Sequence, residues 1–167
     1  MKQNNIIRPT QAKVKQAIFN IFQKEILDSE FLDLFAGKGT IGLEALNRGA
    51  SCVICVDNHP LIAWAIRKPP KITILKQDVF SAIRSLYQQE KKFDFIFADP
   101  PYHQNLYQKI LTGITKYDIL KKSGFLILEH YWKENLPDET ELFKLWQKKR
   151  YGDTVLTIYR KDINPKL

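Results

Sequence analysis

The chain has 167 residues, which is enough for one sizeable hydrophobic core. Its 26 Lys and Arg residues outnumber its 18 Asp and Glu residues, and the formal net charge of +8 favours a polyanionic partner. No apolar run approaches the length that crosses a bilayer, and the first five residues are too polar for a signal peptide. We therefore expect a cytoplasmic protein with no membrane partner.

A short polar arm, residues 1–9, precedes the first predicted helix. Thr10 is a favoured N-cap residue, and an apolar stripe at helical spacing follows it. The stripe consists of Val14, Ala17, Ile18, Ile21 and Phe22. We interpret this stripe as a face that packs on the core.

Strands and helices then alternate along the chain. Apolar runs predict strands over residues 31–36, 51–56, 72–76, 93–98 and 124–129. Helices are predicted over residues 40–48, 61–67, 80–90 and 105–116. The segments 142–149 and 154–160 flank Tyr151-Gly152-Asp153, which predicts an antiparallel hairpin. The pattern indicates a single α/β domain over residues 1–167, with a mainly parallel sheet and helices on both faces.

A glycine-rich loop, Gly37-Lys38-Gly39-Thr40-Ile41-Gly42, lies between the first predicted strand and the next helix. This is the context that a nucleotide-binding fingerprint requires. Gly37 and Gly39 allow a tight turn and a close approach to a ligand, whereas Gly42 lets the helix pack close to the strand. Gly49 is a natural C-terminal cap of that helix. The loop departs from the Walker pattern because Gly39 separates Lys38 from Thr40.

Acidic residues lie at or near the ends of the predicted strands. Asp57 is placed to hold ribose hydroxyls, which an NAD enzyme would also require. Asp33 is suited to the ammonium group of S-adenosylmethionine and would repel a pyrophosphate. Asp78, with Val79, either edges an adenine or caps the following helix. The predicted cofactor-binding residues are Asp33, Phe35, Ala36, Gly37, Gly39, Thr40, Asp57, Asn58, Asp78 and Val79.

The turn Asp99-Pro100-Pro101-Tyr102 follows a predicted buried strand, and we predict that it is catalytic. An exocyclic amine on a base is a poor nucleophile because its lone pair is delocalised. Asp99 and the carbonyl of Pro100 can each accept one N–H, which localises the lone pair. Tyr102 offers a stacking face. The pattern predicts methyl transfer from S-adenosylmethionine to a planar nitrogen, although Asp and Pro also occur in ordinary turns.

The cysteine and histidine residues show no metal-ligand spacing, and we expect no metal. Cys52 and Cys55 lie three apart in a predicted strand, so they face opposite sides and are free thiols. His59, His103 and His130 each follow a predicted strand and are expected on one rim. Basic residues gather at Lys13 and Lys15, Lys91-Lys92, Lys121-Lys122 and Lys148-Lys149-Arg150. Arg67-Lys68 and Lys71 are candidate phosphate contacts, and Glu129 receives no assignment.

The chain resembles the RsmD-like bacterial methyltransferases, which act on a guanine N2 in small-subunit (16S) ribosomal RNA. The segments that carry the resemblance are Arg8-Pro9-Thr10 with Val14 and Phe19-Asn20, residues 32–37 and 42–46, Asp99-Pro100-Pro101-Tyr102 and Tyr151-Gly152-Asp153-Thr154. The resemblance implies a Rossmann-like class I fold, S-adenosylmethionine as cofactor, and ribosomal RNA as partner within an assembled or assembling small subunit. Two departures are a short arm before Arg8 and a short stretch between Asp57 and Asp78.

Three other functions share parts of this sequence pattern. A DNA adenine-N6 methyltransferase would use the same turn, but it normally needs extra length to recognise a DNA sequence. A glutamine methyltransferase commonly has Asn in place of Asp99. A non-catalytic RNA-binding module would not need Asp33, Asp99 and the loop glycines.

Overall fold

The computed structural model describes residues 9–58, 69–102 and 104–162, and the side chains from Gln11 onward. The helix predicted over residues 61–67 lies outside the described residues. So do His59, His103, Arg67 and Lys68, and nearly all of the N-terminal arm. No helix in the described part of the chain is long and apolar enough to span a bilayer.

Seven strands form one mixed sheet in the order β3-β2-β1-β4-β5-β7-β6. The strands are β1 (Glu30–Leu34), β2 (Cys52–Val56), β3 (Ile72–Leu75), β4 (Phe93–Ala98), β5 (Leu120–Tyr131), β6 (Phe143–Tyr151) and β7 (Thr154–Lys161). The pairings from β3 to β5 are parallel, and β7 pairs antiparallel with both β5 and β6. The predicted parallel sheet with a C-terminal antiparallel hairpin is confirmed.

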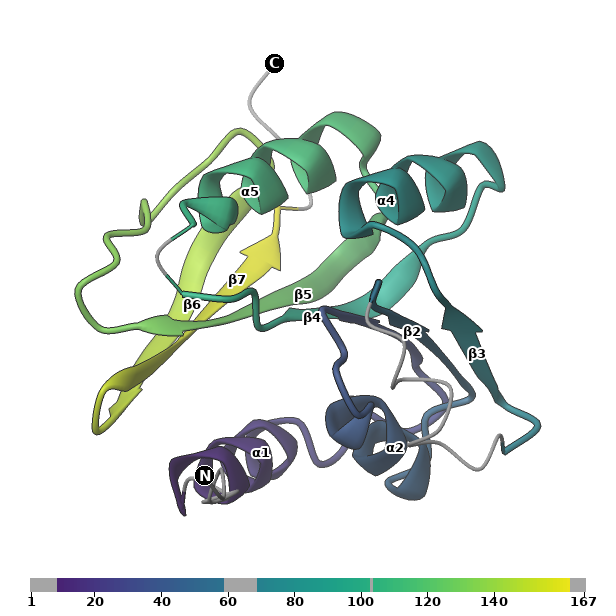
Figure 1. Cartoon of the computed structure of the whole chain (residues 1–167), viewed down its shortest axis with the longest axis horizontal. Coiled ribbons are helices and arrows are strands. Elements are labelled where there is room, and N and C mark those ends of the chain that lie inside the picture. The colour runs from purple at the N-terminus through teal and green to yellow at the C-terminus, as the bar shows by residue number, and fades with distance from the viewer. Residues whose placement is uncertain (1–8, 59–68, 103, 163–167) are drawn as a thin grey trace, which may run out of the picture.

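Helices cover both faces of this sheet, as Figure 1 shows. α1 (Pro9–Ile21) and α2 (Thr40–Asn47) lie on one face, and α4 (Val79–Gln88) and α5 (Leu106–Tyr117) lie on the other. Each face has its own apolar cluster. On the α1 face, Phe22 packs edge-on against Phe95, and the Phe95 and Phe125 rings stack with centroids 5.7 Å apart. This packing fixes α1 against the centre of the sheet.

Most element boundaries lie within two residues of the sequence prediction, and two of the differences have a clear physical reason. The first helix begins at Pro9, so Thr10 lies inside it and is not its N-cap. Proline is favoured at a first helical position because its fixed φ suits the helix and its missing N–H has no helical partner there. β5 begins at Leu120, four residues before the predicted start. Its polar Lys121 is accommodated because its ammonium pairs with Glu30 at 2.8 Å and with Asp94 at 2.9 Å.

The strand order changes direction at β1. The chain places β2 and β3 on one side of β1, and then crosses to the other side to form β4 and β5. β1 pairs with β2 on one side and with β4 on the other. The loops that leave the carboxyl ends of β1 and β4 therefore diverge toward opposite faces. In open α/β sheets this divergence opens the crevice in which ligands bind.

Candidate active site

Three adjoining cavities lie at this carboxyl edge, and Asp99 lines all of them. The large cleft of about 640 Å³ includes Phe35, Gly37, Asp57, Asn58 and Asp78 among its lining residues. The middle cavity of about 410 Å³ includes Asp33, Phe35, Ala36, Gly37 and Thr40. The small cavity of about 180 Å³ is lined by Gln11, Asp99, Pro100, Pro101, Tyr102, Glu129 and Thr154. The acidic residues that follow separate strands thus converge, as the parallel topology predicts.

The glycine-rich loop adopts a backbone that few side chains tolerate. Gly37 and Gly39 have φ values of 55° and 71°, and Phe35 takes a φ of 58° without being glycine. A left-handed conformation at such a residue costs on the order of 1 kcal/mol or more. The turn is held by Ala36, whose N–H donates to the Val56 carbonyl at 3.0 Å, and by Gly39, whose N–H donates to the Ala36 carbonyl at 2.7 Å.

Gly42 has the close-packing role that the sequence predicts. A Cβ atom at this position would lie 2.6 Å from the Cys55 sulfur and 2.9 Å from a Val53 methyl carbon. α2 therefore packs directly on β1 and β2 because no side chain stands between them. Cys55 is buried and Cys52 is partly exposed, and both are free thiols.

Asp33 is a buried carboxyl with half of its hydrogen-bonding capacity unused. It is 1% exposed, and its Oδ2 accepts the Gly42 N–H at 3.0 Å. Its Oδ1 has no hydrogen-bond partner among the described residues. Burial raises the pKa of Asp33 to about 8, with smaller contributions from the negative charges of Asp99 and Asp57. An unpartnered buried oxygen beside a cavity is suited to a cationic ligand group.

The other side of the large cleft is formed by residues after β2 and β3. Asp57 accepts the Gly37 N–H at 2.8 Å, which ties the glycine loop to the end of β2. Asp78 caps α4 by accepting the Ser81 N–H at 2.9 Å, and it also lines the cleft. Asp78 can therefore cap α4 and border the cleft at the same time. Val79 is buried at the start of α4, and Phe80 lines the cleft in its place.

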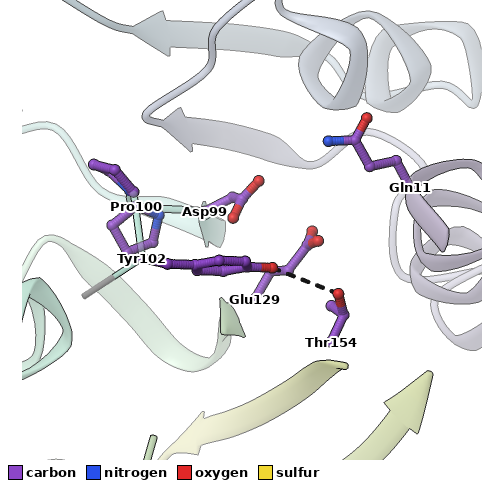
Figure 2. A pocket seen from close by; sticks show the side chains of 7 residues that line it. Gln11, Asp99, Pro100, Tyr102, Glu129 and Thr154 are labelled. Atoms are coloured by element: carbon purple, nitrogen blue, oxygen red, sulfur yellow. Dashed lines mark hydrogen bonds between the residues drawn. The ribbon is translucent and has the colours of Figure 1, made fainter. Parts of the chain in front are cut away.

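The predicted catalytic turn forms one wall of the small cavity, as Figure 2 shows. Pro100 is buried, and Pro101 is exposed. The Tyr102 hydroxyl lies 3.5 Å from the Thr154 hydroxyl at the start of β7. Figure 2 shows the Tyr102 ring between Asp99 and Thr154, which belongs to the C-terminal hairpin.

Glu129 is the residue of this site that the sequence left unassigned. It lies near the end of β5, is 7% exposed, and lines both the small and the middle cavity. Burial raises its pKa to about 8, and the charge of Asp99 adds to the rise. Gln11 and Thr154 were also missed, because α1 and β7 reach this cavity only through tertiary packing. For Glu129, the only indication in the sequence was an acidic residue at the end of an otherwise apolar predicted strand, because buried Glu side chains are rare.

His130 was expected on the rim, and this expectation is wrong. It lies within β5, is fully buried, and its Nε2 lies 2.7 Å from the Thr157 hydroxyl. Its ring packs edge-on against Tyr107, with centroids 5.6 Å apart. Burial lowers the pKa of His130, so it acts as a neutral packing residue. Among the described residues, no three His, Cys, Asp or Glu side chains are grouped to hold a metal.

The fold and the cavity arrangement place the chain among proteins with the class I S-adenosylmethionine-dependent methyltransferase fold. The family described as "Conserved hypothetical protein 95" matches residues 1–160, and the chain belongs to this RsmD-like family. A Bacillus subtilis (strain 168) protein, provisionally named rRNA methyltransferase YlbH, is 34% identical over 161 residues, covering 92% of this chain and 88% of that protein. "Ribosomal RNA small subunit methyltransferase D" of Escherichia coli (strain K12) is 25% identical, covering 93% of this chain and 80% of that protein.

Solved structures show the same fold. The Escherichia coli protein yhhF, provisionally named a methyltransferase, superposes with a TM-score of 0.83 at 23% identity, covering 94% of this chain and 88% of that one. SMU.776, provisionally named a methyltransferase and solved in complex with SAH, gives a TM-score of 0.72 at 16% identity. That match covers 90% of this chain and 49% of SMU.776.

Proposed function

We propose that this chain transfers a methyl group from S-adenosylmethionine to the exocyclic N2 of a guanine in small-subunit ribosomal RNA, within an assembled or assembling subunit. The observation that carries the proposal is the position of Asp99, which lines both the large cleft and the small cavity. A single carboxylate thereby borders the space for a cofactor and the space for a base. The names of the relatives support ribosomal RNA as the substrate class.

The large cleft and the middle cavity fit the cofactor. A cleft of about 640 Å³ is within the usual range for small-molecule sites. The unused Oδ1 of Asp33 would accept a hydrogen bond from the ammonium group, and Asp57 with Asn58 would hold the ribose hydroxyls. Phe80 offers an apolar wall for the adenine. When bound, the cofactor supplies an electrophilic methyl group on a cationic sulfur.

Asp99 and its turn prepare the amine for attack. Asp99 and the Pro100 carbonyl each accept one N–H of the amine, which localises the nitrogen lone pair. The two prolines hold these acceptors in place before the base arrives, so little reorganisation is needed. The nitrogen–carbon bond would form as the bond between the methyl carbon and the cationic sulfur breaks, leaving a neutral thioether, and Asp99 would accept the proton that the nitrogen loses. Tyr102 stacks on the base and keeps the nitrogen directed at the large cleft.

Glu129 gives the small cavity a preference for guanine. Guanine presents an N1–H donor beside its exocyclic amine, whereas adenine and cytosine present a ring acceptor there. An ionised Glu129 accepts that N1–H while Asp99 accepts an N2–H. The positive charge of the cofactor favours ionisation of both carboxyls, although burial raises the pKa of Glu129 to about 8 in the free protein. In adenine or cytosine, the ring nitrogen beside the amine would direct its lone pair at the Glu129 carboxylate, so the two groups would repel each other.

The proposal is tested by measuring transfer of a labelled methyl group to three substrates: naked small-subunit RNA, small subunits, and duplex DNA. We expect label in a ribosomal substrate and none in duplex DNA. Label in duplex DNA alone would contradict the RNA proposal. A protein that binds no S-adenosylmethionine by calorimetry would contradict the assignment as an enzyme and favour an RNA-binding module.

A further inference from the structure

A chain of aromatic rings leads outward from the small cavity to the protein surface. The Tyr102 and Tyr131 ring centroids are 6.0 Å apart, and those of Tyr131 and Trp132 are 5.9 Å apart. Tyr131 is partly exposed, and Trp132 is 40% exposed. The two separations place the Trp132 ring at most about 12 Å from the Tyr102 ring. Single exposed aromatic residues are common, whereas a contiguous series of rings that reaches the surface is typical of a binding surface.

Two cations accompany the outermost ring. The Arg150 guanidinium carbon lies 4.4 Å from the centre of the Trp132 ring, and the Lys133 ammonium lies 5.3 Å from it. Both residues are exposed. Lys148 is also exposed, and because it lies two residues before Arg150 in β6, it shares that residue's face of the strand. The surface therefore combines a stacking face with charges that complement phosphate groups.

The backbone holds this surface in place. The Trp132 N–H donates to the Asp153 carbonyl at 3.0 Å, which joins the end of β5 to the hairpin turn. The Arg150 Nε donates to the Gly152 carbonyl at 2.7 Å. Tyr131 pairs with Thr154 across β5 and β7, and the Thr154 hydroxyl is also the one that Tyr102 approaches. The same contacts at the end of β5 and the start of β7 therefore position both the outer rings and one wall of the small cavity.

We propose that Tyr131 and Trp132, with Lys133 and Arg150, form a second base-stacking site that holds the nucleotide next to the target guanine. This inference rests on the proposed function, since it assigns the neighbour of the base that enters the small cavity. A target base has to leave its stack to be methylated, which leaves the adjoining base without a partner. Trp132 offers that base a replacement stacking surface, and Arg150 and Lys133 contact its phosphates.

The test uses two nine-residue single-stranded RNAs of uridines with one central guanine. One carries the fluorescent base 2-aminopurine on the 5′ side of the guanine, and the other carries it on the 3′ side. Each RNA is titrated to saturation with the wild-type protein, Trp132→Leu and Trp132→Phe. We expect one of the two probes to be quenched by the wild type, because stacking on an aromatic ring quenches this fluorophore.

Trp132→Leu should abolish that quenching and weaken binding of the responding RNA by about five- to a hundredfold, the range that corresponds to one stacked base. Trp132→Phe should retain most of the quenching and most of the wild-type affinity, because it keeps an aromatic ring at this position. Replacing Arg150 and Lys133 together by Gln should lower the salt slope of log affinity by about 0.7 for each lost phosphate contact. Affinity for S-adenosylmethionine should stay unchanged in every variant, which shows that the fold is intact.

Three results would overturn the stacking site. The first is that wild type and Trp132→Leu give equal affinity and equal quenching with both RNAs, or that the wild type binds neither. The second is that Trp132→Leu weakens binding to whole small subunits but not to the RNAs, which would assign the surface to a protein contact. The third is that cofactor affinity falls together with RNA affinity. The readout is binding, so the two proposals can fail separately. A protein that stacks the neighbouring base but methylates no guanine would contradict the proposed function and still support the stacking site.

Discussion

Replacing Asp33 by Asn should stabilise the fold while weakening cofactor binding. The free protein holds this buried carboxyl with a pKa of about 8, above its ordinary value of 3.8. Keeping such a group neutral at pH 7 costs about 4 kcal/mol, at about 1.4 kcal/mol per pH unit. An Asn side chain avoids that cost and can still accept the Gly42 N–H. Its NH₂ group would be buried without an acceptor at the position of the unpartnered Oδ1, at about 1–3 kcal/mol.

The net expectation is that Asp33→Asn raises the free energy of unfolding at pH 7 by about 1–3 kcal/mol, the difference between these two costs. The pH dependence has a definite sign. A carboxyl whose pKa is higher in the folded state contributes stability below its unfolded pKa, and that stability is lost as pH rises toward 8. The advantage of Asp33→Asn over wild type should therefore grow by about 3 kcal/mol between pH 5 and pH 7.

The assay is urea denaturation at pH 5, 6 and 7, followed by the fluorescence of the three Trp residues. The exposed Glu141 provides the control, because Glu141→Gln makes the same change of acid to amide at the surface. Calorimetry should show S-adenosylmethionine affinity reduced about ten- to a hundredfold in Asp33→Asn, as for loss of a charged hydrogen bond. Methylthioadenosine, which lacks the amino acid, should bind both proteins equally. Equal pH slopes for wild type and variant, or equal affinity for S-adenosylmethionine, would refute the reasoning.

Four further predictions concern other parts of the site. Asp99→Ala should lower turnover by about a hundredfold or more with cofactor affinity nearly unchanged in calorimetry, because it removes a preorganised acceptor. Asp57→Ala should weaken cofactor binding, and unchanged affinity would place the ribose elsewhere. In binding titrations without cofactor, the affinity for RNA should rise as pH rises from 6.5 to 8, since Glu129 must ionise, and Glu129→Gln should remove that trend. Gly42→Ala should lower the free energy of unfolding by about 1–3 kcal/mol in urea titrations, because its Cβ meets the Cys55 sulfur.

The sequence was sufficient to predict the convergence of Gly37, Asp57, Asp78 and Asp99, which all line the large cleft. Each lies at or just after a strand, and the carboxyl ends of parallel strands share one edge of the sheet. The close approach at Gly42 was predictable for a related reason, since the glycine spacing fixes where α2 meets β1. These features depend on local pattern and topology alone.

Other site residues were not predictable in this way. Glu129 and His130 are neighbours in β5, so their side chains point to opposite faces of the sheet, Glu129 toward the cavity and His130 toward Tyr107 and Thr157. The predicted strand ended at residue 129, whereas β5 continues to Tyr131, so His130 lies inside the sheet and not on the rim. Thr154 and Gln11 enter the site from β7 and α1, whose placement depends on packing over the whole sheet. At α4, the helix begins one residue earlier than its apolar pattern indicated, so Phe80 lines the cleft where Val79 was expected.

The most direct test of the central claim is the identity of the methylated nucleoside. Small subunits are incubated with the protein and cofactor, and their RNA is digested and analysed by mass spectrometry. The account predicts N2-methylguanosine with the wild-type protein and at most about a hundredth of that amount with Asp99→Ala at equal cofactor saturation. A different methylated nucleoside, or equal N2-methylguanosine from the wild type and Asp99→Ala, would contradict it.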